Sequence, residues 1–160
     1  MATPADVVHE ILDMLEAVGA DPRIAGGWGI DALTGAQSRE HRDLDLAIRA
    51  DALDDSLAAL ASKGYEVTTD WLPVRIELSD ATSHVDLHPL HYDEDGSAWQ
   101  AAPDNARFIY PAEGWVVGRI GGRAVLCLSA RQQRVFHAGY ELSDVARDDM
   151  ALLERYERTR

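Results

Sequence analysis

Residues 26–48 constrain this sequence more than any other segment. The glycine pair Gly26-Gly27 leads into a short apolar segment, a polar loop follows, and Asp43 and Asp45 then alternate with apolar residues. Successive side chains of a β-strand point to opposite faces, so Asp43 and Asp45 project from the same face. Two neighbouring carboxylates repel each other unless a cation lies between them, and such oxygen ligands suit Mg²⁺. Because glycines let a backbone approach phosphate oxygens closely, the segment predicts a metal site beside a phosphate-binding turn.

Length, charge and cysteine content narrow the class of protein. With 160 residues, 46% hydrophobic and 27% charged, we expect one soluble domain covering residues 1–160. The sequence has neither a long apolar run nor a signal-peptide pattern, and Cys127 is its single cysteine, so we expect a cytoplasmic protein that does not span a membrane. The net charge of −13 argues against a nucleic acid polymer as partner. It suits a cationic small substrate, or serves solubility alone.

Apolar periodicity and turn residues predict an α+β (mixed α/β) fold, with a mixed sheet flanked by helices and a helical C-terminal subregion at 129–160. We expect helices at 6–18, 28–33, 52–63 (capped by Asp51), 129–137 and from 143 or 144 to 156. We expect strands at 23–25, 44–48, 65–70, 74–78, 84–90, 108–110, 116–120 and 123–128. Residues 91–105 are expected to form a long loop.

The strand expected at 84–90 places three titratable side chains, His84, Asp86 and His88, on one face. If this strand lies beside the one that holds Asp43 and Asp45, Asp86 completes a carboxylate triad. His88 is then a candidate proton acceptor, because its ordinary pKa lies near neutrality. Two other interpretations are an exposed polar edge strand and a zinc site. Zinc is disfavoured because ligands at alternate positions of a straight strand spread over about 13 Å.

A glycine turn before a helix, two alternating aspartates and a third aspartate on another strand together suit nucleotidyl transfer assisted by two metal ions. Six motifs continue this pattern in order along the chain: GGWGIDALTG (26–35), REHRDLD (39–45), WLPVRIEL (71–78), DLHP (86–89), DGS (95–97) and FHAGY (136–140). Together they resemble the antibiotic nucleotidyltransferases of the DNA polymerase β superfamily, and within them the small lincosamide nucleotidyltransferases. The resemblance covers nearly the whole chain and implies the nucleotidyltransferase fold.

The resemblance also implies roles for the residues around the glycine turn. Gly26 and Gly27 would line the nucleotide phosphates, and Arg39 would lie near the triphosphate. Asp43 and Asp45 would bind Mg²⁺, with two ions expected and ATP or another NTP as co-substrate. The implied reaction transfers AMP, or another nucleoside monophosphate, to a sugar hydroxyl of the drug and releases pyrophosphate. Small members of this family form homodimers with the antibiotic near the subunit interface, so a homodimer is expected.

On the strand expected at 84–90, the resemblance places Asp86 at the third acidic, metal-binding position and leaves Asp86 and His88 as rival candidates for the base. The sequence departs from the family pattern at two places. Ala47 stands where members have a further acidic residue, and Trp28 follows the glycine pair where the wider superfamily often has Gly-Ser. Both departures leave the metal pair intact and leave the acceptor drug open.

Two alternatives to lincosamide transfer follow from the same residues. An aminoglycoside O-nucleotidyltransferase suits the net charge of −13, because aminoglycosides are polycations. A non-catalytic nucleotide-binding module of the same fold is disfavoured because all three aspartates, Asp43, Asp45 and Asp86, are present.

Overall fold

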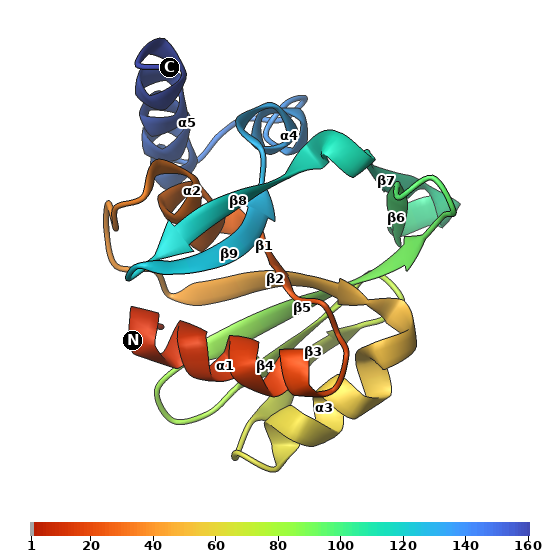
Figure 1. The fold of residues 1–160 in the computed structure, drawn as a ribbon. Helices are drawn as coiled ribbons and strands as arrows, with labels where there is room; N and C mark the ends of the chain where they lie inside the picture. The colour runs from red at the N-terminus through yellow and green to blue at the C-terminus, as the bar shows by residue number, and fades with distance from the viewer. Residues whose placement is uncertain (1) are drawn as a thin grey trace.

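A mixed nine-stranded β-sheet forms the centre of the structure, a computed structural model that describes residues 2–160 (Figure 1). Neighbouring strands follow the order β3-β4-β5-β2-β1-β9-β8, and β6 and β7 extend the sheet from β5. The pairs β2/β5 and β1/β9 are parallel, whereas the other pairs are antiparallel. The strands are β1 (Arg23–Ile24), β2 (Asp43–Arg49), β3 (Glu66–Trp71), β4 (Arg75–Ser79), β5 (His84–Tyr92), β6 (Ala98–Ala101), β7 (Arg107–Tyr110), β8 (Trp115–Ile120) and β9 (Arg123–Leu128).

Helices flank this sheet, as the sequence predicts. In Figure 1, α1 and α3 cover one side of the sheet, while α2, α4 and α5 lie toward the other end of the molecule. The helices are α1 (Ala5–Ala17), α2 (Gly26–Thr34), α3 (Leu53–Ala61), α4 (Ala130–Phe136) and α5 (Asp144–Arg158), with short 3₁₀ turns η1 (Ala50–Ala52), η2 (Pro103–Asn105) and η3 (Ala112–Gly114). None of the helices in residues 2–160 combines the length and the apolar character needed to cross a membrane.

The alternation in β2 separates the core from the site. Leu44, Leu46 and Ile48 are fully buried in the larger apolar cluster, together with the inward residues of α1. Asp45 and Ala47 point to the opposite face, where Ala47 joins a smaller apolar cluster formed with residues of β5, β6, β7, β8 and β9. Because the first cluster buries one face of β2 completely, a one-residue shift in register would drive the aspartates into the core.

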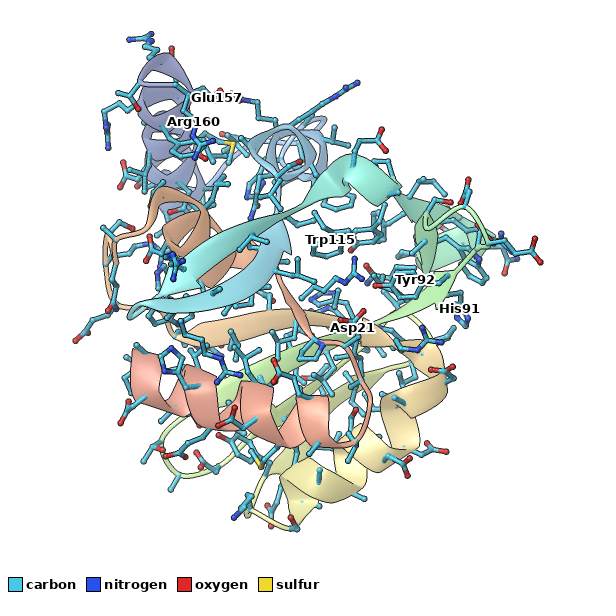
Figure 2. All side chains as sticks on the ribbon, viewed as in Figure 1. Asp21, His91, Tyr92, Trp115, Glu157 and Arg160 are labelled. Atoms are coloured by element: carbon cyan, nitrogen blue, oxygen red, sulfur yellow. The ribbon has the colours of Figure 1, made fainter. Side chains whose placement is uncertain are left out.

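The smaller cluster is closed at one end by aromatic and arginine side chains. The guanidinium of Arg23 lies 5.2 Å from the ring centre of Tyr92 and 5.4 Å from that of Trp115, distances typical of cation–π contacts. Figure 2 shows Tyr92 and Trp115 near the β6–β7 end of the sheet, far from Glu157 and Arg160 at the end of α5. These contacts tie β1, β5 and β8 together on the face of the sheet that holds Asp45.

Three local predictions are wrong. The stretch expected to be a loop contains β6, which pairs with β5 and β7. Asp51 does not cap α3, because its carboxylate binds the guanidinium of Arg49 at 2.9 Å and Ala52 occupies the cap position without a side-chain bond. Helix α2 begins at Gly26 rather than behind the glycines, so the glycine pair forms its first turn.

The predicted C-terminal helical part is confirmed, and its two helices, α4 and α5, are capped by Ser129 and Ser143. The hydroxyl oxygens of Ser129 and Ser143 each accept a hydrogen bond, at 3.2 Å, from the backbone N–H three residues ahead. Such caps satisfy N–H groups that the first turn of a helix leaves without partners. Arg134 of α4 pairs with Glu157 of α5 and joins the two helices.

Candidate active site

The centre of the site lies where β2 and β5 run parallel. Their register sets Asp45 directly opposite Asp86 and Ala47 opposite His88. Ligand atoms of Asp45, Asp86 and His88 all lie within 4.8 Å of one another. The Nε2 atom of His88 is 3.5 Å from Oδ1 of Asp45 and 3.6 Å from Oδ2 of Asp86. The prediction of this cluster depended on the strand with Asp86 lying beside the strand with Asp45, and the two strands are neighbours.

Asp43 lies at the margin of this cluster. It is the first residue of β2, pairs with His84 in the register and is exposed. Its carboxylate lies 3.4 Å from the guanidinium of Arg42. Within residues 2–160 the compact metal-ligand group does not include Asp43, so its predicted role as a Mg²⁺ ligand remains a prediction.

The glycine pair brings the first turn of α2 against this cluster. Gly26 has φ +60°, a conformation that side chains other than glycine rarely adopt, and a Cβ there would overlap the carboxylate of Asp45. A Cβ at Gly27 would lie 2.5 Å from Nδ1 of His41 and 2.8 Å from Nη2 of Arg39. Glycine is therefore required at Gly26, whereas a side chain at Gly27 would force His41 and Arg39 to shift. The first N–H groups of α2 have no partner within the helix and form an electropositive end beside Asp45.

Arg39 lies beside Gly27 and is held there by a residue near the C-terminal end of the chain, and its role near the triphosphate stays a prediction. Its Nη2 atom donates to Oδ2 of Asp149 in α5 at 3.1 Å. The Asp149 side chain is almost buried. The two partners are 110 positions apart in the chain, which explains why sequence reasoning did not find Asp149.

Arg75 is a site residue that the sequence analysis did not single out. Its Nη1 atom lies 2.5 Å from both Oδ2 of Asp86 and Oε1 of Glu77. Its guanidinium also stacks 4.3 Å from the ring centre of Trp71, which is 57% exposed. A cation–π contact of this kind is strongest for tryptophan. The signal for this residue was its place inside the motif WLPVRIEL, between the tryptophan and the glutamate that it contacts.

Burial and charge perturb the titration of the two β5 residues. Burial, with the nearby charge of Asp45, raises the pKa of Asp86 to about 6, although His88 and Arg75 act in the opposite direction. Burial lowers the pKa of His88, but the hydrogen bond to Asp45 and the charges of Asp86 and Asp45 outweigh it, so the net direction is upward. Groups with such shifts in a cavity are typical of catalytic sites.

A cavity of about 540 Å³ opens onto Asp45 and His88. Its wall comes from the β3–β4 turn, from β6 and β7 and from α4, all within this chain. Apolar and aromatic side chains dominate it: Trp71, Val74, Pro103, Phe108, Tyr110, Leu128, Phe136 and Tyr140. Among the residues that line it within the described chain, Asp45 is the one carboxylate. A volume of this order accommodates a drug-sized molecule.

The family model for aminoglycoside-2''-adenylyltransferases matches residues 7–153 of the chain. The chain belongs to this family. A lincosamide resistance protein from Staphylococcus haemolyticus is 33% identical over 145 residues, which are 90% of each sequence. The chain therefore belongs with the antibiotic nucleotidyltransferases, as the motifs indicate.

Solved structures of antibiotic nucleotidyltransferases have the same fold. The lincosamide antibiotic adenylyltransferase LnuA in its lincomycin-bound form is 32% identical, with a TM-score of 0.84 over 92% of this chain and 94% of that chain. ANT(2'')-Ia in complex with adenylyl-2''-tobramycin is 22% identical, with a TM-score of 0.73 over 93% and 86% of the two chains. At that identity the second likeness concerns the fold alone.

The acidic cluster of this nucleotidyltransferase fits a divalent cation. Oδ1 of Asp86 is buried without a hydrogen-bond partner, and Oδ2 of Asp45 faces the glycine turn. A buried acceptor without a partner costs free energy unless a ligand satisfies it. Hard carboxylate oxygens are the ligands that Mg²⁺ prefers. Asp45 and Asp86 are therefore the residues best placed to hold such an ion.

Proposed function

We propose that this protein transfers AMP from ATP to a sugar hydroxyl of a lincosamide antibiotic, releases pyrophosphate and thereby inactivates the drug. The observation that carries the acceptor class is the apolar wall of the cavity beside Asp45. A lincosamide combines a sugar with an apolar portion that such a wall can bury. The relatives that are 32% and 33% identical, both named for lincosamides, support the same acceptor.

An aminoglycoside is the second candidate acceptor, supported by the family description and by the net charge of −13. A polycation would need several carboxylates around it to replace its hydration. The cavity lining includes Asp45 as its one carboxylate among the described residues, and Arg75 places a positive charge in the same wall. The local charges therefore favour the lincosamide over the aminoglycoside, whereas the net charge is a property of the whole surface.

The residues of the site suit an in-line displacement at the α-phosphorus. The acceptor oxygen forms a bond to phosphorus, the bond from phosphorus to the oxygen that bridges to the β-phosphate breaks, and pyrophosphate leaves. The hydroxyl proton passes to Asp86 or His88, the two candidates that the sequence left open. Gly26, Gly27 and the free N–H groups of α2 would bind the phosphates, with Arg39 beside them.

Two Mg²⁺ ions held by Asp43, Asp45 and Asp86 would neutralise charge on the triphosphate and lower the pKa of the attacking hydroxyl. Burial, together with the charge of Asp45, raises the pKa of Asp86 to about 6, and bound cations would offset the unfavourable charge of its buried carboxylate. Assembly as a homodimer also remains a prediction, and sedimentation would measure it.

A panel assay tests the proposal. Pyrophosphate release is measured with ATP and Mg²⁺ in the presence of lincomycin or tobramycin, and mass spectrometry follows the drug. We expect adenylylated lincomycin and little turnover of tobramycin. If aminoglycosides alone are turned over, the lincosamide assignment is wrong and the protein is an aminoglycoside nucleotidyltransferase. ATP binding by calorimetry without turnover of any drug would instead support the non-catalytic nucleotide-binding module.

A further inference from the structure

A buried amide lies behind His88, on the side away from the carboxylates. Gln100 of β6 is 3% exposed, and its Nε2 atom lies 3.0 Å from Nδ1 of His88 and 2.9 Å from the carbonyl oxygen of Val74. The hydroxyl of Tyr110, itself 6% exposed, donates to Oε1 of Gln100 at 2.7 Å. All the polar atoms of the Gln100 amide therefore have partners, although sequence reasoning assigned this residue to a loop.

The partners of Gln100 decide which way its amide faces. The carbonyl of Val74 can only accept a hydrogen bond, so the group 2.9 Å from it is the NH₂ of Gln100. A flipped amide would place two carbonyl oxygens against each other in a buried position. The second hydrogen of the same NH₂ points to His88, so Nδ1 of His88 accepts it. A neutral imidazole that accepts at Nδ1 has its proton at Nε2.

We infer that Gln100, oriented by Val74 and Tyr110, is a positioning residue that fixes His88 in its Nε2–H tautomer with this N–H facing Asp45 and Asp86. The inference rests on the transfer site proposed above. In this tautomer Nε2 donates a hydrogen bond and has no free lone pair. His88 is then neither a metal ligand nor the proton acceptor, and Asp86 takes the hydroxyl proton. His88 instead holds the carboxylates through its N–H, 3.5 Å from Oδ1 of Asp45.

The inference gives the β6–β7 ribbon a role in the site. β6 pairs with the end of β5 and β7 pairs with β6, with Ala98 opposite Tyr110 in the register. This short extension brings Gln100 and Tyr110 against His88 from outside the parallel β2/β5 core. Hydrogen-bonding side chains behind the ligands of a metal site commonly change metal affinity or activity about 10–100-fold when they are removed. Gln100 would act on Asp45 and Asp86 in this way, through His88.

Nitrogen-15 NMR of histidine-labelled protein tests the tautomer directly. The chain has six histidines, and the signal lost in His88→Ala identifies His88. In chelator-treated protein at alkaline pH we expect Nε2 of His88 to show a protonated, pyrrole-type shift and Nδ1 an unprotonated, pyridine-type shift. A ring protonated at Nδ1, alone or together with Nε2, would overturn the inference whatever the enzyme transfers.

Two substitutions of Gln100 separate positioning from packing. Gln100→Glu offers Nδ1 only acceptors, so we expect the tautomer to switch to Nδ1–H. Gln100→Met keeps the length of the side chain without a donor, so the tautomer preference should weaken. In both variants we expect kcat to fall about 10–100-fold while KM for ATP stays unchanged. Unaltered tautomers in both variants would contradict the role of Gln100.

Gln132→Met is the matched control for these variants. Gln132 is also buried, at 4% exposed, and its amide donates at 3.1 Å to the carbonyl of Ile109, away from His88. We expect it to lose stability as Gln100→Met does, without any change in the His88 signal. If Gln132→Met lowers kcat as much as Gln100→Met does, the loss in Gln100→Met comes from packing and the inference fails. If the wild type modifies no drug but shows the Nε2–H signal, the proposed function fails while the positioning of His88 stands.

Discussion

Two histidine–carboxylate contacts lie beside the glycine pair, one against each glycine. His41 binds Asp31 next to Gly27, and His88 faces Asp45 and Asp86 next to Gly26. Both histidine side chains are mostly buried. Asp31 and His41 are 10 positions apart in the chain, whereas Asp45 and His88 are 43 positions apart. The two contacts differ in whether every carboxylate oxygen has a hydrogen-bond partner. We call the His41–Asp31 contact structural and the contact of His88 with Asp45 and Asp86 reactive.

The His41–Asp31 contact is complete. The carboxylate of Asp31 is 2% exposed and accepts from Nε2 of His41 on one oxygen and from the hydroxyl of Ser38, at 2.6 Å, on the other. It fastens the polar loop that contains Arg39 to α2. In the second contact Oδ1 of Asp86 has no partner and burial raises the pKa of Asp86 to about 6. The first contact therefore stabilises the fold, whereas the second holds free energy that a bound cation can recover.

Asp45→Asn should have the largest effect on activity. In the proposed reaction this carboxylate would hold a metal ion beside the transferring phosphate, so we expect kcat/KM to fall about 10²–10³-fold when it is removed. The melting temperature should not decrease, because the substitution relieves repulsion with Asp86. Pyrophosphate release and thermal melting measure both quantities. Asp51→Asn, which alters an exposed carboxylate paired with Arg49, is the control; near-normal turnover in Asp45→Asn would exclude Asp45 as a metal ligand.

The reactive contact could be predicted from the sequence because its residues follow strand periodicity. Asp45, Asp86 and His88 stand at alternate positions of two strands, and the parallel register brings them together. The mixed sheet and the C-terminal helices followed from apolar spacing and turn residues in the same way. These features depend on local patterns, which a single sequence contains.

The parts that could not be predicted depend on which of several available partners a residue or strand edge finds in the folded structure. β6 has four residues with a buried glutamine, so its inward face has no apolar alternation to mark it as a strand. It forms because β5 extends past residue 90 and offers a pairing edge. The N-cap expected at Asp51 was lost to Arg49, which binds the carboxylate from two residues upstream. Asp149 likewise reaches Arg39 only through the packing of α5.

Asp31→Ala should have the largest effect on stability. The substitution leaves Nε2 of His41 and the hydroxyl of Ser38 without their buried acceptor, so we expect the free energy of unfolding to fall by about 3 kcal/mol. Activity per folded molecule should fall less than in Asp45→Asn. Denaturant unfolding with parallel assays measures both. Asp31→Asn retains one acceptor and should be intermediate; a stability equal to the wild type would show that the two contacts do not differ as argued.

Asp86→Asn should change stability in the opposite direction and in a pH-dependent way. The pKa of Asp86 is raised from 3.8 to about 6 in the folded protein, so the folded state is favoured by protonation. That stabilisation is complete below about pH 3.8 and is lost as the pH rises through 6. Between about pH 4 and about pH 8, the wild type should therefore lose on the order of 3 kcal/mol relative to Asp86→Asn.

Denaturant unfolding in the presence of a chelator, at several pH values, measures this difference. Adding Mg²⁺ should reduce the advantage of Asp86→Asn at alkaline pH, because an ion that binds the folded wild type stabilises it. Asp31→Asn provides the matched comparison, since it alters a carboxylate whose two oxygens already have partners. If Asp86→Asn is less stable than the wild type at about pH 8, the charged carboxylate of Asp86 does not destabilise the folded protein, and the contrast with Asp31 fails.

Trp71→Ala should have the smallest effect on activity, and we expect it to change only the binding of the drug. Trp71 stands 57% exposed at the cavity and stacks on Arg75, which in turn binds Asp86. If the cavity binds the acceptor as proposed, losing the ring would remove apolar contact with it, so we expect KM for lincomycin to rise about tenfold, with KM for ATP unchanged. Trp99→Ala is the control, because Trp99 stacks under Arg107 at 3.7 Å and does not line the cavity. A rise in KM for ATP instead would mean that Trp71 acts through Arg75 on the acidic cluster. The cavity wall and the reactive contact would then be coupled and could not be altered independently.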